Sequence, residues 1–153
     1  MSKAQCTPQN KQSYDRMIQK AKNYMAHYLM TNDEEHVLGL LRNKFPVRVT
    51  LEGLPLLHFA VMHDVSAPIL SALLAYGADI QAKTWEGRTV CHWVCRMARQ
   101  DLLQLLVANI KEQGLEHMWS ERSCGMQTPA MCVLQNWKTS NELIQYCIAH
   151  LGL

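Results

Sequence analysis

The chain has 153 residues, of which 48% are hydrophobic and 18% are charged, and its formal net charge is +2. These proportions are those of one globular domain, and so small a charge excess disfavours a strongly basic nucleic-acid or membrane-surface binder. No apolar run is long enough to span a membrane, and residues 1–12 lack the apolar stretch of a secretory signal, so we expect a cytoplasmic or nuclear protein.

Two helices are predicted in the first third of the chain. Residues 1–12 carry almost no apolar side chains and are expected to form a flexible tail. From residue 13 to residue 29, apolar side chains recur at steps of three and four, which is the period of a helix with one buried face. A second helix is expected to follow Thr31, where capping-box spacing precedes the apolar residues 37–41. Residues 13–47 therefore predict a helix pair.

The same helix-turn-helix pattern then recurs along the chain. Residues 53–60 (GLPLLHFA) match residues 87–94 (GRTVCHWV), and their histidines, His58 and His92, stand 34 positions apart. A weaker copy at residues 126–133 (MQTPAMCV) places Met131 at the histidine position. Each copy is followed by a second apolar helix, and a period of this length is typical of stacked repeats.

These segments resemble the ankyrin-repeat family, whose pattern is G-x-T-P-L-H-x-A and a second helix ending in L-L-x-x-G-A-D. The most specific match is residues 73–84 (LLAYGADIQAKT), followed by Gly87, Thr89 and His92. The resemblance implies an all-α solenoid of about four helix-turn-helix repeats with short hairpin connections. It implies one domain over residues 13–153, with repeats at about 13–47, 50–83, 84–114 and 123–153.

The resemblance also implies that His27, His58 and His92 point inward and hydrogen-bond to adjacent loops. The chain departs from the family at Pro55, where threonine is usual, and after the third repeat, where about six residues are added. We expect the second helix of that repeat to end at Gly114, because glycine tolerates the left-handed conformation that ends helices. Residues 115–124 are then an atypical loop, and the first and fourth repeats act as caps.

The six cysteines are expected to be free thiols, since nothing in the sequence indicates secretion. Cys91, His92 and Cys95 lie within one helical turn and could suggest a zinc site or a Cys–His nucleophile. However, the chain has no C-x2-C pair, and Cys91 and Cys95 stand where the family has leucine and alanine. Phosphate-loop and hydrolase motifs are also lacking. We therefore expect no enzyme, no metal and no cofactor.

The family resemblance implies a partner-binding surface on the hairpin tips and on the concave side of the first helices. Trp85 is the strongest candidate, because tryptophan is enriched at binding hot spots; its alternative is to fold over a neighbouring hairpin. Arg88, Arg96 and Arg99 could meet an acidic or phosphorylated segment, or simply face solvent. Trp93 and Trp137 are expected in the core. The predicted partner-binding residues are Leu51, Glu52, Leu54, Met62, His63, Trp85, Glu86, Arg88, Arg96, Met97, Gln127, Gln135 and Asn136.

We therefore expect a non-catalytic protein-protein interaction module that regulates its partner and binds no membrane. Its length and repeat number are similar to those of small ankyrin-only regulators, which favours a regulatory subunit of a cell-cycle protein kinase complex. One alternative is the retention of a Rel-type transcription factor in the manner of inhibitor-of-κB proteins. A second alternative is nucleic-acid binding through the basic N-terminal helix, which carries Tyr14, Arg16, Lys20, Lys22 and Tyr24. The acidic residues 33–35 follow closely and disfavour a continuous basic surface.

Overall fold

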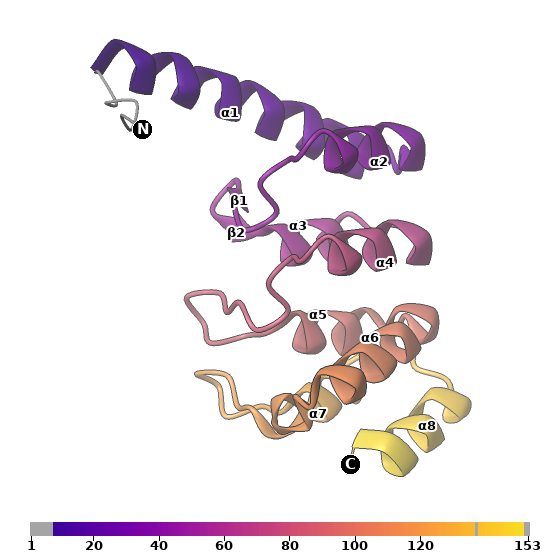
Figure 1. The fold of residues 1–153 in the computed structure, drawn as a ribbon. Helices are drawn as coiled ribbons and strands as arrows, with labels where there is room; N and C mark the ends of the chain where they lie inside the picture. Colours follow the sequence, from indigo (N-terminus) through magenta and orange to yellow (C-terminus); the bar gives the residue numbers. More distant parts are fainter. Residues whose placement is uncertain (1–7, 137, 152–153) are drawn as a thin grey trace.

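The computed structural model describes residues 8–136 and 138–151, and within these ranges eight α-helices stack as four pairs (Figure 1). Trp137, predicted to be a core residue, lies outside the described residues. None of the described helices is both long and apolar enough to cross a membrane. The first pair is α1 (Pro8–Met30) with α2 (Glu34–Arg42), and the second is α3 (Leu56–Met62) with α4 (Ala67–Ala75); the third is α5 (Val90–Met97) with α6 (Gln100–Gln113), and the fourth is α7 (Pro129–Val133) with α8 (Asn141–Leu151).

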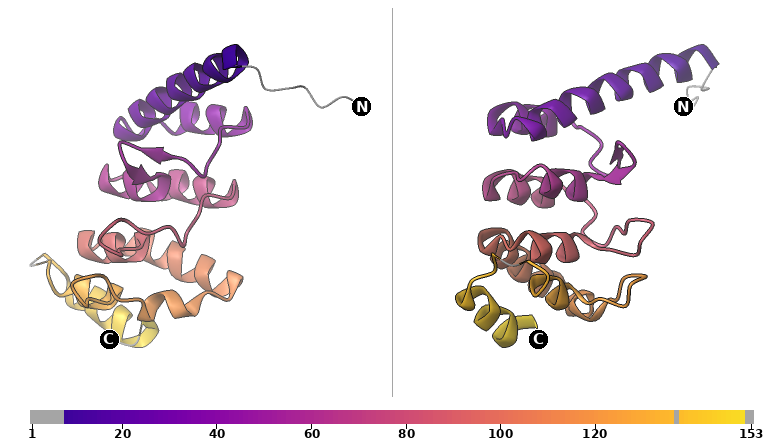
Figure 2. Two further views of the ribbon diagram at one scale, coloured as in Figure 1. Left: turned by 90° about the vertical axis from the view of Figure 1, so that its left-hand side faces the viewer. Right: turned by 180° about the vertical axis from the view of Figure 1, so that it is seen from behind.

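Each helix pair packs on the next along one axis. The first helices contact one another in the order α1, α3, α5 and α7, and α2, α4 and α6 form a second row beside them. The segments that connect one pair to the next protrude together from the same side of the stack (Figure 2). We call residues 50–55, 84–88 and 123–127 the second, third and fourth fingers, after the helix pair that each precedes.

Helix α1 is longer than the sequence pattern predicts. It begins at Pro8, so the prediction of a flexible tail is wrong for residues 8–12, whereas residues 1–7 lie outside the described range. Adding a residue to an existing helix costs far less than starting one, and proline is tolerated in the first turn, so a polar segment extends α1 without being buried. Met25 and Leu29 are buried near the C-terminal end of α1, and this end of the helix packs on the stack.

The second finger is a two-stranded hairpin formed by β1 (Thr50–Leu51) and β2 (Leu54–Pro55). Glu52 and Gly53 at its tip both have positive φ, 52° and 81°, as the tightest right-twisted hairpin turns require. Thr50 is exposed whereas Leu51 is 2% exposed, because neighbouring strand residues point to opposite faces.

Helix α6 ends as predicted, because Gly114 adopts the left-handed conformation with φ 69°. The following Leu115 N–H then donates to the Ile110 carbonyl at 2.9 Å and closes the helix end. The predicted loop at 115–124 contains a short 3-10 helix, η1 (Glu116–Ser120), whose residues Met118 and Trp119 are buried. The added residues therefore contribute to the core, which is continuous through all four pairs.

Candidate functional site

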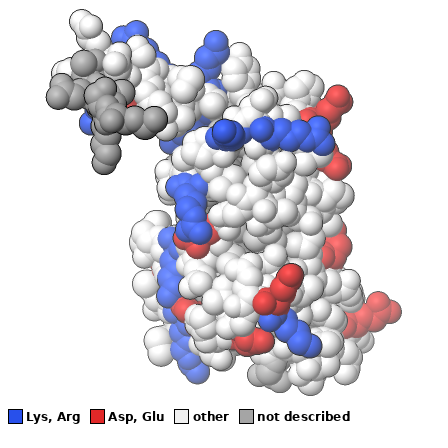
Figure 3. Space-filling view, viewed as in Figure 1, with Lys and Arg blue, Asp and Glu red and all other residues white. Residues whose placement is uncertain are grey.

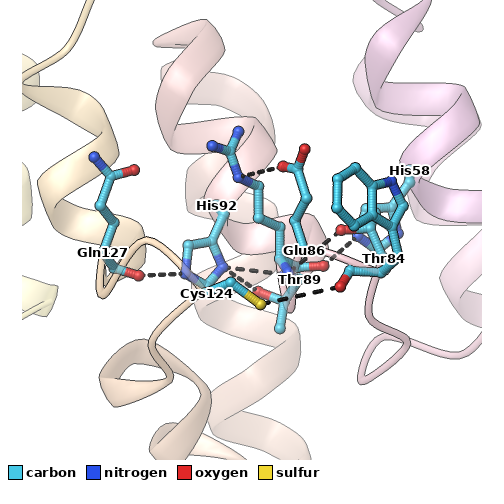
Figure 4. A network of polar contacts seen from close by, with 9 residues as sticks. His58, Thr84, Glu86, Thr89, His92, Cys124 and Gln127 are labelled. Atoms are coloured by element: carbon cyan, nitrogen blue, oxygen red, sulfur yellow. Dashed lines mark hydrogen bonds and ion pairs between the residues drawn. The ribbon is translucent and has the colours of Figure 1, made fainter.

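Two histidines tie neighbouring helix pairs together. His58 of α3 lies 2.9 Å through Nε2 from the Arg88 carbonyl in the third finger. His92 of α5 lies 2.8 Å through Nε2 from the Gln127 carbonyl in the fourth finger. Because a carbonyl can only accept, both rings carry their proton on Nε2 and donate it. Figure 4 shows His92 beside Gln127 and the polar contacts that continue toward His58, so the inward role predicted for these two histidines is confirmed.

The same prediction for His27 is wrong. His27 is exposed and lies edge-on against Tyr28, with ring centroids 5.7 Å apart. Met25 and Leu29 are buried two positions before and after it, and two steps along a helix turn the side chain to the opposite face. At this end of the stack Asn32 makes the tie instead, since its Oδ1 accepts from the Ser66 N–H at 2.9 Å.

The second ring nitrogen distinguishes His92 from His58. Nδ1 of His92 accepts from the Thr89 N–H at 3.1 Å and lies 3.0 Å from the Thr89 hydroxyl. At the matching position before His58 stands Pro55, which has neither N–H nor hydroxyl. Nδ1 of His58 is accordingly buried with no hydrogen-bond partner among the described residues. Burial lowers the pKa of both rings, so both are neutral at neutral pH.

The third finger and the exposed side of α5 form a groove of about 180 Å³. It brings together five residues that the sequence predicts to bind a partner, although they come from two fingers and a helix. Thr84 and Trp93 complete its lining. We call it the tryptophan-arginine groove; its residues are Leu54, Thr84, Trp85, Glu86, Arg88, Trp93 and Arg96.

Trp93 is part of this groove rather than the deep core. It is half-buried, and the guanidinium carbons of Arg88 and Arg96 each lie 5.9 Å from its ring centroid. Both arginines therefore contact the indole, and Arg88 also forms an ion pair with Glu86 at 3.1 Å. The indole nitrogen of Trp93 is buried without a hydrogen-bond partner in the described parts of the chain. A signal for this role was in the sequence, since Trp93 precedes Arg96 by three residues, on one helix face.

Trp85 projects from the third finger with 90% of its surface exposed, so it does not fold over a neighbouring finger. The finger beneath it is held in place. The Thr84 carbonyl accepts from the Gly87 N–H at 2.9 Å, and the Cys124 N–H of the fourth finger donates to the Glu86 carbonyl at 2.8 Å. An exposed indole on a fixed backbone loses little freedom when a partner covers it.

The remaining predicted residues do not line the groove, and one prediction among them is wrong. Leu51 is 2% exposed and belongs to the core, because the register of the hairpin turns it inward. Two others are engaged within the protein, since the Gln127 carbonyl accepts from His92 and the Asn136 side chain donates to the Arg96 carbonyl at 2.9 Å. The exposed or half-buried remainder is Glu52, Met62, His63, Met97 and Gln135.

Arg99 is half-buried and is engaged by two carboxylates of the protein itself. It forms ion pairs with Asp64 and with Asp101, at 2.7 Å in the second case, and these hydrogen bonds raise the pKa of its guanidinium and lower that of the Asp101 carboxyl. Arg99 thus joins the turn after α3 to the start of α6. Of the three arginines proposed from the sequence to meet an acidic segment, Arg88 and Arg96 remain.

The buried cysteines behave as small apolar side chains. Cys91, Cys95, Cys132 and Cys147 are buried free thiols, and Cys124 is an exposed one. Burial raises the pKa of Cys91 to about 12 and also raises that of Cys95, so both stay protonated. Neutral thiols in an apolar core fit the packing role predicted for them. Within the described residues, no group of three metal-binding side chains is found.

The basic residues of the alternative nucleic-acid site lie along α1. Arg16 and Lys20 are exposed, and Lys20 lies 6.0 Å from the ring centroid of Tyr24. Tyr24 in turn stacks on Tyr28 with centroids 6.1 Å apart, whereas Tyr14 is 57% exposed and stacks on no aromatic ring among the described residues.

Comparison with known proteins supports the fold. No family model matches the chain, and no curated protein matches it. A solved structure, that of the ankyrin repeat domain of Bcl-3, described as a unique member of the IkappaB protein family, superposes with a TM-score of 0.59 at 23% identity. The match covers 79% of this chain and 49% of the other, so the chain spans about half of that structure's length. At this identity the likeness shows the ankyrin-repeat fold alone.

Proposed function

We propose that the chain is a non-catalytic module that regulates another protein by binding it through the tryptophan-arginine groove. The observation that carries the proposal is Trp85, which is 90% exposed on a finger held by hydrogen bonds. Isolated apolar side chains are common on surfaces, but an exposed tryptophan beside two arginines has the composition of a binding hot spot. The ankyrin-repeat fold is consistent with this function.

For the partner, we favour a cell-cycle protein kinase complex, of which the chain would be a regulatory subunit in the cytoplasm or nucleus. This rests on the resemblance to small ankyrin-only regulators of such kinases, including the embryonic activator subunit Plutonium. The second candidate is a Rel-type transcription factor, which is favoured by the likeness to a domain described as a member of the IkappaB family.

The proposal is tested by affinity capture from native extract with three forms of the chain. Wild type is compared with Trp85→Ala/Arg96→Glu, which alters the groove, and with Tyr76→Ala/Arg42→Glu, which changes an exposed tyrosine and arginine on the second and first pairs. Circular dichroism establishes that all three are folded. We expect one stoichiometric partner with wild type and with the control, and its loss with the groove variant.

The captured partner is then identified by mass spectrometry, purified and titrated with each form by calorimetry. A kinase subunit supports the first candidate, and a change in kinase activity on adding the chain completes the evidence. A Rel-type factor supports the second. Equal affinity of the partner for wild type and for the groove variant would place the contact elsewhere and refute the proposal.

A further inference from the structure

We infer that the tryptophan-arginine groove binds an acidic peptide segment of the partner, with an aspartate or glutamate carboxylate on Arg96 and an apolar side chain against Trp85. This inference rests on the proposed function and adds the chemistry of what is bound. The reasons are the charges of the groove, the arrangement of its arginines and the exposure of its tryptophan.

The groove carries more positive than negative charge. Two arginines, Arg88 and Arg96, face one carboxylate, Glu86, which already pairs with Arg88. Of the other finger-side carboxylates, Asp79 pairs with Arg48 and Glu121 pairs with Lys83, whereas Glu52 at the tip of the second finger forms no ion pair among the described residues and does not line the groove. Arg96 is exposed and has no ion-pair partner among the described residues. Figure 3 shows Lys and Arg side chains along the edge where the fingers lie, whereas Asp and Glu prevail on the opposite edge.

The arginines are arranged to receive a carboxylate. Arg88 and Arg96 lie at the same distance, 5.9 Å, from the Trp93 ring, which restricts the guanidinium groups before a ligand arrives. A guanidinium group presents parallel N–H donors that match the two oxygens of a carboxylate. Prior restriction reduces the entropy lost on binding, so a single carboxylate on Arg96 can contribute strongly.

The apolar part of the ligand is indicated by Trp85 and Leu54. Trp85 is exposed and Leu54 is half-buried, and both line the same groove. A groove of about 180 Å³ admits one or two side chains rather than a folded domain. A segment with an apolar residue next to acidic ones therefore complements both the shape and the charge of the groove.

The experiment uses the full chain and a phage-displayed library of random peptides. The library is selected separately against wild type, Arg96→Glu and the matched control Arg42→Glu. We expect wild type and the control to enrich peptides in which aspartate or glutamate adjoins an aromatic or aliphatic residue, and Arg96→Glu to lose the acidic residues. A peptide selected by wild type should bind about tenfold or more weakly to Arg96→Glu and to Trp85→Ala, by fluorescence polarisation.

The outcomes separate this inference from the proposed function. Neutral or basic peptides that still require Trp85 would overturn the acidic assignment and leave the groove as the binding site. Peptides that bind Trp85→Ala as well as wild type would refute both. Replacing the key glutamate by phosphoserine tests the source of the negative charge, and a gain of more than about tenfold would overturn the carboxylate assignment. Displacement of the peptide by single-stranded RNA would likewise overturn it.

Discussion

The second and third helix pairs carry the same histidine at the same position, but the two rings are used differently. His92 bonds through both nitrogens, with Gln127 on one side and Thr89 on the other. His58 bonds to the next pair in the same way, but its Nδ1 has no partner among the described residues because Pro55 offers no donor. The Nε2 bond to the next helix pair and the Nδ1 bond within the same pair are therefore separate contributions of one histidine side chain.

The largest expected effect on stability comes from removing the imidazole ring of His92 or of His58. His92→Ala should lower the free energy of unfolding by about 3–4 kcal/mol, because it removes two hydrogen bonds, leaves the Gln127 carbonyl unpaired and opens a cavity. His58→Ala should cost about 1 kcal/mol less, since its Nδ1 makes no bond to lose. Urea unfolding followed by circular dichroism measures both. Equal losses would show that the Thr89 contact adds nothing.

A smaller effect is expected from making the third pair like the second. Thr89→Pro removes the donors that face Nδ1 of His92 and should cost about 1–3 kcal/mol, the range for a buried group left unpaired. Thr89→Ser keeps both donors and serves as the control, with stability close to that of wild type. Stability unchanged in Thr89→Pro would contradict the capping role. The same unfolding experiment gives both values.

The pH dependence of stability should come next in size. Burial lowers the folded-state pKa of His58 and His92, so the unfolded chain binds more protons as pH falls through its own histidine pKa of about 6.5. Stability is therefore full above that pH and declines below it, by about 1.4 kcal/mol per histidine for each unit by which its folded-state pKa lies below its unfolded-state pKa. Melting temperatures between pH 7 and pH 5 test this. The variant His58→Gln/His92→Gln should lose most of the dependence, and an unchanged slope would contradict the assignment.

The smallest expected effect is that of Pro55→Thr, which makes the second pair like the third. New bonds to Nδ1 of His58 stabilise the fold, whereas the loss of proline gives the unfolded chain more freedom, so the net gain should stay below about 1 kcal/mol. The direct measurement is nitrogen-15 NMR of the His58 ring, which should show Nδ1 becoming a hydrogen-bond acceptor. An unchanged Nδ1 signal would mean that the threonine cannot reach the ring.

Much of this fold could be predicted from residues that act through their own backbone conformation. Gly114 ends α6 as predicted, because one left-handed residue suffices to end a helix. The start of α1 at Pro8 could not be predicted in the same way, since polar residues that extend a helix into solvent leave no apolar period. His27 was assigned by its spacing from His58, but spacing does not tell which face of α1 is buried.

The sequence predicted candidate-site residues that project from a finger into solvent. It did not predict which face of the hairpin a strand residue occupies. Trp85 projects from its finger as the sequence suggests, whereas Leu51 turns inward because the register of β1 and β2 alternates the sides of the hairpin. Trp93 was expected in the core because it lies within a helix. Its contact with Arg96 follows from their spacing of three residues along α5, whereas its contact with Arg88 depends on how the third finger folds back beside α5. Such contacts between elements are absent from local sequence patterns.

The order of the two histidine ties along the chain has a consequence for how the protein is made. Each ring lies upstream of the carbonyl that it binds, by 30 residues for His58 and by 35 for His92. During synthesis from the N-terminus, a helix pair can therefore form before its acceptor leaves the ribosome, and each new finger meets a donor already in place. Because each helix pair packs mainly on the pair before it, folding can proceed sequentially from the N-terminus.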